Sequence, residues 1–169
     1  MQKYIAQGIG FVGMALVFVA FQQNDKRRLL WIQAGSAVVF AAHFLLLGAL
    51  TGMAMNLLEV PRNILFSKER GRRAQVILAV VFVSLFAAIG IITWDSPMSI
   101  FPILAMGLST VVFSLRKPRT IRFCTVPVSV FWIVYNIASL SIAGVITESI
   151  CLLSIIIAIF RYDIKKKQE

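Results

Sequence analysis

Two long apolar stretches of this sequence each contain a carboxylate, Glu59 in the earlier stretch and Glu148 near the C-terminus. The earlier stretch also carries Asn56, Arg62 and Asn63 around a proline. A charge placed in hydrocarbon costs about 2.5–3.5 kcal/mol on insertion scales, so such a side chain is expected to face a bundle interior or a cavity. An α-helix places Asn56, Glu59 and Asn63 on one face. The sequence therefore places polar groups that can bind a solute inside two membrane helices.

Three further polar residues fall at the depth of the two carboxylates. Counting inward from the predicted helix ends at about 1.5 Å per residue places His43, Tyr135 and Asn136 in the same layer, in the outer half of the membrane. Phe40 and Trp132 lie beneath this layer and would form an aromatic floor. We therefore predict a substrate-binding site made of Asn56, Glu59, His43, Trp132, Tyr135, Asn136 and Glu148.

The residue types of this layer are suited to holding a small polar molecule. Trp132 would stack on a flat or sugar-like face, and Asn56, Tyr135 and Asn136 would orient polar groups. Two carboxylates at close range are not readily both ionised, which would suit a proton-linked site or a cationic substrate.

A structural interpretation of the same residues stays open. Glu59 would pair with Arg62 one turn further on, and Glu148 would bond Tyr135 or Thr147, as fasteners between helices. Arg62 lies toward the cytoplasmic end of its predicted span, so we expect its side chain to snorkel to that surface.

Composition identifies an integral membrane protein. Of the 169 residues, 59% are hydrophobic and 14% are charged, and the mean hydropathy is +0.87. The apolar residues form blocks that approach the roughly 20 residues needed to span a bilayer. We predict seven spans, at residues 4–21, 29–48, 52–66, 74–94, 98–115, 120–139 and 142–162.

The net charge of +10 reflects membrane topology. Of the 17 Lys and Arg residues, all except Lys3 and Arg62 lie in alternate connections, in the C-terminal segment, or within three residues of these inside a predicted span. This asymmetry predicts an N-terminus outside the cell and a C-terminus in the cytoplasm, because cytoplasmic loops carry the excess of Lys and Arg. It also argues against nucleic-acid binding, which we do not expect.

The sequence contains few residues in patterns typical of catalytic sites. The sequence contains no Walker loop, dinucleotide fingerprint, Gly-x-Ser-x-Gly or His-Glu-x-x-His motif, and it has a single histidine. Cys124 and Cys151 have neither metal-ligand nor disulfide spacing, and both are expected to pack as small apolar residues. We predict a protein that is not an enzyme and that has no cofactor or metal site.

The spans fall into two similar halves. A shift of 92 residues superposes several pairs, namely Met14 with Met106, Phe21 with Phe113, Arg27 with Arg119, Phe40 with Trp132 and His43 with Tyr135. Beyond the turn between the second and third spans, an offset of 89 residues would place Glu59 on Glu148. The pattern predicts a first three-helix bundle at residues 1–73, a linker helix at 74–97 and a second bundle at 98–169. The two bundles would have the same orientation, as in a parallel repeat.

This all-α, seven-span, 3+1+3 arrangement resembles that of the SWEET sugar transporters. The whole chain resembles the bacterial YgjV-type inner-membrane proteins, distant members of the SWEET/PQ-loop group, which implies a multi-pass protein of the bacterial inner membrane. The Pro-Gln pair that names the PQ-loop group is missing, and Met14–Val17 stands in its place. SWEET proteins use an Asn on spans 3 and 7. Asn56 would serve on span 3, but span 7 has Thr147 and Glu148, which argues against a sugar.

Three hypotheses for the function follow. The first is a small-solute transporter or facilitator that works by alternating access between the two bundles. The second is a non-transporting receptor or partner protein on the same scaffold, as the resemblance to PQ-loop-type KDEL receptors implies. The third is an assembly factor without a ligand, which the polar layer disfavours. The expected partners are the lipid bilayer and a small polar solute, and a homo-oligomer is compatible with the sequence.

Overall fold

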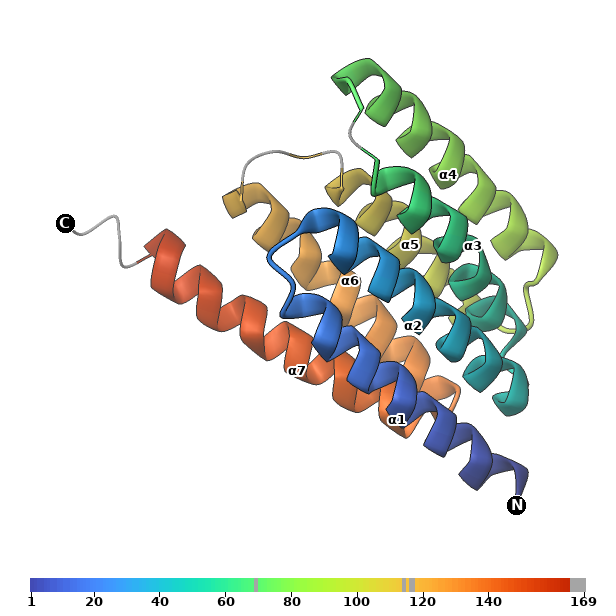
Figure 1. Cartoon of the computed structure of the whole chain (residues 1–169). Helices are drawn as coiled ribbons and strands as arrows, with labels where there is room; N and C mark the ends of the chain where they lie inside the picture. Colours follow the sequence, from blue (N-terminus) through green and yellow to red (C-terminus); the bar gives the residue numbers. More distant parts are fainter. Residues whose placement is uncertain (69, 114, 116–117, 165–169) are drawn as a thin grey trace.

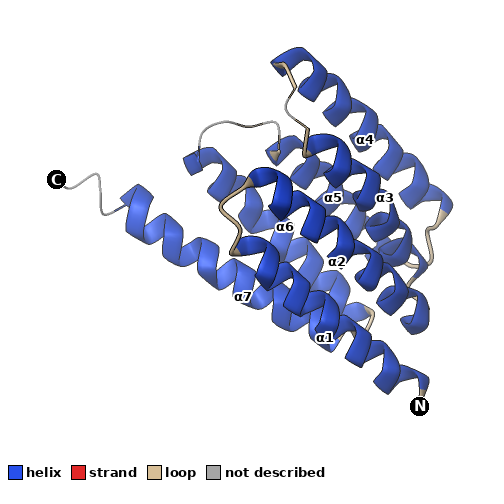
Figure 2. Ribbon diagram, viewed as in Figure 1, coloured by secondary structure: helices blue, strands red, loops and turns tan. Residues whose placement is uncertain are grey.

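The computed structural model describes residues 1–68, 70–113, 115 and 118–164. The described residues form seven α-helices and contain no β-strand (Figure 2). The helices are α1 (Gln2–Phe21), α2 (Lys26–Leu47), α3 (Leu50–Phe66), α4 (Arg72–Ile92), α5 (Ile100–Val112), α6 (Pro118–Ala138) and α7 (Ile142–Ile159). A 3-10 turn, Pro97–Ser99, precedes α5, and a π-helical turn, Phe160–Ile164, continues α7. The predicted all-α fold is confirmed.

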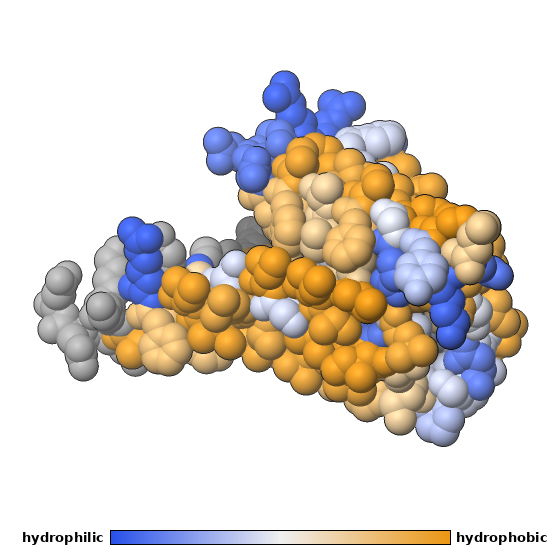
Figure 3. Space-filling model, turned by 90° about the horizontal axis from the view of Figure 1, so that it is seen from below, coloured by the Kyte–Doolittle hydropathy of each residue, from blue (hydrophilic) through white to orange (hydrophobic). Residues whose placement is uncertain are grey.

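Five of these helices are long and apolar enough to cross a membrane, namely α1, α2, α4, α6 and α7. The helices α3 and α5 are shorter, with 17 and 13 residues. The expected span at 98–115 is therefore longer than the α-helix found there, because the turn Pro97–Ser99 replaces its first residues. The visible face in Figure 3 is mostly hydrophobic, with hydrophilic residues gathered toward its ends, as a bilayer-embedded bundle requires.

Successive helices run in opposite directions, which gives the bundle two different ends (Figure 1). The starts of α2, α4 and α6 lie at the same end as the last residues of α1, α3, α5 and α7. We call this the basic end, because Lys26–Arg28, Arg70, Arg72, Arg73 and Arg119 lie there. The other end holds the N-terminus and the two tight turns, α2–α3 and α6–α7. We call it the sealed end.

The two tight turns have the same geometry. Gly48 and Leu140, which are 92 residues apart, both adopt positive φ, at 77° and 56°. In the first turn the Ala49 N–H donates to the Phe44 carbonyl at 2.9 Å. In the second turn, 92 residues later, the Ser141 N–H donates to the Asn136 carbonyl at 2.8 Å. This left-handed helix stop is a common way to end a helix, and glycine suits it better than leucine.

The matching turns correct the offset expected for the third helix of each half. No residue is inserted or lost in either turn, so the shift of 92 residues continues into α3 and α7. Glu148 therefore matches Asn56, and Glu59 matches Cys151. The expected offset of 89, which paired Glu59 with Glu148, is wrong.

Close packing of α6 against α7 depends on a glycine at the start of α7. Gly144 is buried, and a Cβ atom added there would overlap the Asn136 side chain and would lie 2.6 Å from Ser141 Oγ. Only a residue without a side chain lets the two helices approach this closely.

We expect Gly144→Ala to destabilise the protein by about 1–3 kcal/mol, because the added methyl group must displace packed atoms. Gly8→Ala in α1 is the matched control, since an added Cβ there meets no atom within 4 Å. That control should be neutral or stabilising by up to about 1 kcal/mol, from helix propensity. Thermal unfolding in detergent measures both, and equal midpoints would contradict this account of the α6–α7 contact.

Candidate functional site

A cavity of about 830 Å³ lies among six of the seven helices. Its lining residues come from α1, α2, α3, α5, α6 and α7, and α4 contributes none among the described residues. Toward the sealed end the lining begins at Phe44, Asn136 and Gly144. It continues along the helices to the basic end, where the exposed Gln22 and the half-buried Arg122 lie at the rim. We call this cavity the central pocket.

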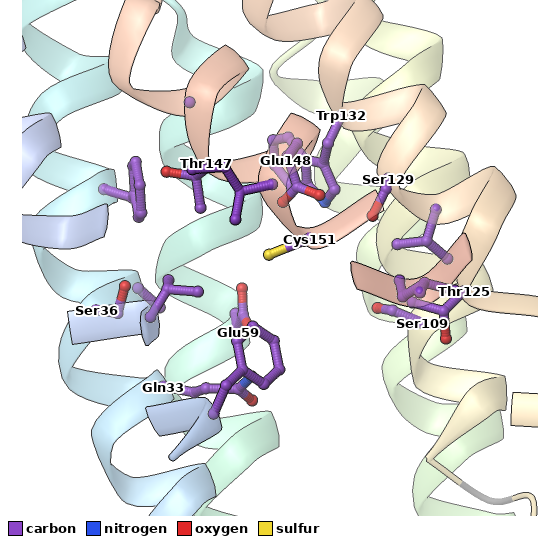
Figure 4. A pocket seen from close by; sticks show the side chains of 18 of the residues that line it. Gln33, Ser36, Glu59, Ser109, Thr125, Ser129, Trp132, Thr147, Glu148 and Cys151 are labelled. Atoms are coloured by element: carbon purple, nitrogen blue, oxygen red, sulfur yellow. The ribbon is translucent and has the colours of Figure 1, made fainter. Parts of the chain in front are cut away.

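Five of the seven residues predicted for the site line the central pocket, namely Asn56, Glu59, Trp132, Asn136 and Glu148. In Figure 4, Glu59 and Glu148 approach the pocket from different helices, with Trp132 beside Glu148. Asn56 and Glu148 occupy matching positions on the third helix of each half, so an amide in one half corresponds to a carboxylate in the other.

The other two predicted residues, His43 and Tyr135, do not line the central pocket. The His43 ring is fully buried, with Nδ1 2.7 Å from the Ala6 carbonyl and Nε2 2.7 Å from Ser141 Oγ. Because a carbonyl only accepts, Nδ1 carries the proton and Nε2 accepts from the serine. Tyr135 Oη accepts a hydrogen bond from the Gly52 N–H at 2.7 Å. Both side chains fasten helices to one another at the sealed end.

These two fasteners are reciprocal. His43 and Tyr135 match under the shift of 92 residues. His43 reaches from α2 to the start of α7, and Tyr135 reaches from α6 to the start of α3. Gln7 of α1 adds a third contact, because its side chain donates to the Leu140 carbonyl at 2.7 Å. Hydrogen bonds from each half of the chain thus reach the other half at the sealed end.

Arg62 is buried, contrary to the expectation that it snorkels to the surface. Its side chain is 2% exposed, and Nη2 donates to Glu59 Oε1 at 2.9 Å. Nη1 donates to Ser109 Oγ of α5 at 2.8 Å, and the guanidinium carbon lies 4.9 Å from the Phe113 ring centroid. The guanidinium turns inward because these partners satisfy a charge that hydrocarbon would not.

The fastener interpretation is confirmed for Glu59, whereas for Glu148 the helix contact is made with a different residue from the two expected. Glu59 pairs with Arg62 as expected. The two partners proposed for Glu148 form hydrogen bonds with other groups. Tyr135 Oη accepts from the Gly52 N–H of α3, and Thr147 Oγ1 donates to the Ala143 carbonyl at 2.7 Å. Ser129 of α6 lies within reach of the Glu148 carboxyl group (Figure 4).

Sequence reasoning missed several residues of the pocket wall, among them Gln33, Ser36, Phe44, Ser129 and Cys151. Phe44 stacks on Trp132 with ring centroids 6.0 Å apart and an interplanar angle of 23°. The signal for Cys151 was available, because the shift of 92 residues places it on Glu59. Gln33 and Ser129 were visible only as polar residues in apolar segments.

An ion pair holds two helices together at the mouth of the central pocket. Arg122 of α6 donates two hydrogen bonds to Asp163, at 2.8 and 2.7 Å. These bonds hold the pKa of Asp163, which lies beyond α7, below its ordinary value. The pair therefore stays charged at neutral pH. Among the described residues, no cluster of three or more His, Cys, Asp or Glu side chains is arranged to hold a metal ion.

We expect Glu59→Gln to lower the stability by about 3 kcal/mol, because it leaves the buried Arg62 guanidinium without a counter-charge. Adding Arg62→Met to that variant should restore part of the loss, since the unpaired charge is then gone. Thermal unfolding of the two single variants and the double variant in detergent measures the coupling. Strictly additive losses would show that the pair does not act as a unit.

Comparison with known proteins places the chain in a family. The family Imp-YgjV, described as bacterial inner membrane protein, matches residues 4–166. The inner membrane protein YgjV of Escherichia coli (strain K12) is 25% identical over 150 residues, which cover 89% of this chain and 80% of that relative. No solved structure matches. The chain belongs to the Imp-YgjV family of bacterial inner membrane proteins.

Proposed function

We propose that this protein is a small-solute transporter or facilitator and not an enzyme. In this proposal α1–α3 and α5–α7 are two bundles in a SWEET-like 3+1+3 arrangement, joined by α4, with the N-terminus outside and the C-terminus in the cytoplasm. The observation that carries the proposal is the central pocket itself. It lies between the two sets of three helices, contains polar groups at mid-helix depth, and extends to one end of the bundle only.

The contacts at the sealed end are of a kind that can open. They are a few hydrogen bonds, in which His43 and Tyr135 each accept one across the halves and the Gln7 amide bonds the backbone of residues 140, 142 and 143. Hydrogen bonds between membrane helices are worth about 0.6 kcal/mol on average, so a few of them form a reversible closure. Opening at this end and closing at the basic end would move the central pocket from one side of the membrane to the other.

Two prolines support movement of this kind. Pro61 lies within α3 and Pro127 within α6, and each removes a backbone hydrogen bond from a helix that lines the central pocket. Such interruptions are found beside the binding sites of secondary transporters. A receptor that binds its ligand without transporting it would also need a pocket. The two functions differ in that only a transporter must make the central pocket accessible from both sides of the membrane.

The native thiol of Cys151 reports on that access, because it lines the central pocket. We expect a membrane-impermeant methanethiosulfonate to label Cys151 from both sides of the membrane in the Cys124→Ala protein. Labelling should be faster from the side that faces the basic end, toward which the pocket extends. Right-side-out and inside-out vesicles, analysed by intact-protein mass spectrometry, give the two rates.

The control is the Cys124→Ala/Cys151→Ala protein, which should take up no label from either side. Labelling from one side alone, under all conditions, would contradict alternating access and favour a receptor on the same scaffold.

A further inference from the structure

One carboxylate of the central pocket has no ion-pair partner among the described residues. Four charged side chains line it, and two of them, Arg62 and Glu59, pair with each other at 2.9 Å. The third, Arg122, pairs with Asp163 at 2.7 Å. The fourth, Glu148, makes no ion pair with any residue that the structure describes. A carboxylate in such surroundings is costly unless a proton or a cation neutralises it.

Several hydrogen-bond donors of the pocket wall are already committed to backbone carbonyls. Asn56 Nδ2 donates to Gly52 at 2.9 Å, and Thr147 Oγ1 donates to Ala143 at 2.7 Å. The Ser36 hydroxyl donates to a carbonyl of α1 at 3.0 Å. The two hydroxyl groups can offer a ligand only their oxygen lone pairs, because their protons point at the backbone, whereas Asn56 keeps its side-chain oxygen and one amide hydrogen.

Acceptors of the same wall are left without donors. Gln33 Oε1 and Asn136 Oδ1 are buried and have no hydrogen-bond partner among the described residues. Both donors to Glu59, from Arg62 and Asn63, go to Oε1. No described residue donates to its other oxygen, Oε2. Buried acceptors normally receive a hydrogen bond, so a ligand that supplies hydrogen-bond donors or positive charge would complement this part of the pocket wall.

An aromatic surface lies beside the unpaired carboxylate. Phe44 and Trp132 are stacked, and Figure 4 shows Trp132 next to Glu148. A cation over the face of a tryptophan is attracted by the ring quadrupole, more strongly where water is excluded. The remaining wall is largely apolar, with Val17, Phe18 and Ile155 among its residues. It can therefore hold the hydrocarbon part of a ligand.

We propose that the central pocket binds an organic cation, an amine or quaternary ammonium with an apolar or aromatic body. The charged nitrogen pairs with Glu148 against Trp132, and the apolar body lies along the wall toward the basic end. This inference rests on the proposed function, because it names the class of solute that the transporter would carry.

The test is equilibrium binding of radiolabelled benzyltrimethylammonium to the purified natural protein in detergent. Benzenesulfonate, which has the same ring and the opposite charge, and glucose serve as competitors. We expect saturable binding that neither competitor displaces. We expect Glu148→Gln to weaken this binding more than about tenfold, because the variant removes the carboxylate that pairs with the nitrogen. Asp25→Asn, which removes a carboxylate outside the central pocket and keeps a residue suited to cap α2, should bind as the natural protein does.

Three results would overturn the substrate class. They are the absence of cation binding, displacement of the bound cation by benzenesulfonate at similar concentration, and unchanged affinity in Glu148→Gln. If Glu148→Gln does not fold, protection of Cys151 in the Cys124→Ala protein replaces it. Benzyltrimethylammonium should then slow labelling of this thiol, and an unchanged rate would overturn the proposal.

The same reagents separate this inference from the function on which it rests. Two-sided labelling of Cys151 without cation binding would overturn the substrate class and leave the transport proposal standing. Cation binding with one-sided labelling would support the ligand class and overturn transport.

Discussion

The ion pair between Arg62 and Glu59 decides how charge is arranged at the centre of the fold. A guanidinium that is 2% exposed must be neutralised and hydrogen-bonded, and Glu59, Asn63 and two hydroxyl groups of α5 do this. Because the contacts to α5 join α3 to the second half of the chain, the pair is also structural. Glu59 is thereby committed to Arg62, and Glu148 is left as the pocket carboxylate without a counter-charge among the described residues.

The stretches α1–α3 and α5–α7 share matching turns and closing contacts but carry different side chains in the central pocket. Matching turns at Gly48 and Leu140 set the same register in α3 and α7. The equivalent residues His43 and Tyr135 close the sealed end with hydrogen bonds that cross between the halves. In the proposed transporter, the matching helices would rock about the central pocket, and the side chains that differ between the halves would bind one class of solute. We regard this division between framework and pocket as the main feature of the molecule.

The sequence predicted the helices and five of the residues that line the central pocket, because hydropathy and buried polarity depend on composition along one segment. It could not show which way a side chain turns at a given depth. His43 and Tyr135 were expected in the layer of Glu148, but they face neighbouring helices instead. Arg62 was expected to snorkel to the surface. The hydroxyl groups of α5 that bind it inside the protein are far away in sequence, so the sequence did not reveal them as partners. The repeat offset also depended on turn geometry, which sparse identities do not reveal.

The most direct test of alternating access is the distance between the two tight turns in a lipid bilayer. Spin labels would be placed at Leu47→Cys and Ser139→Cys, which occupy matching places at the ends of α2 and α6, with Cys124 and Cys151 replaced by alanine. Electron–electron double resonance in lipid nanodiscs should then show two distance populations, the longer one corresponding to an open sealed end. A single distance that is the same in detergent, in nanodiscs and with benzyltrimethylammonium would contradict the account.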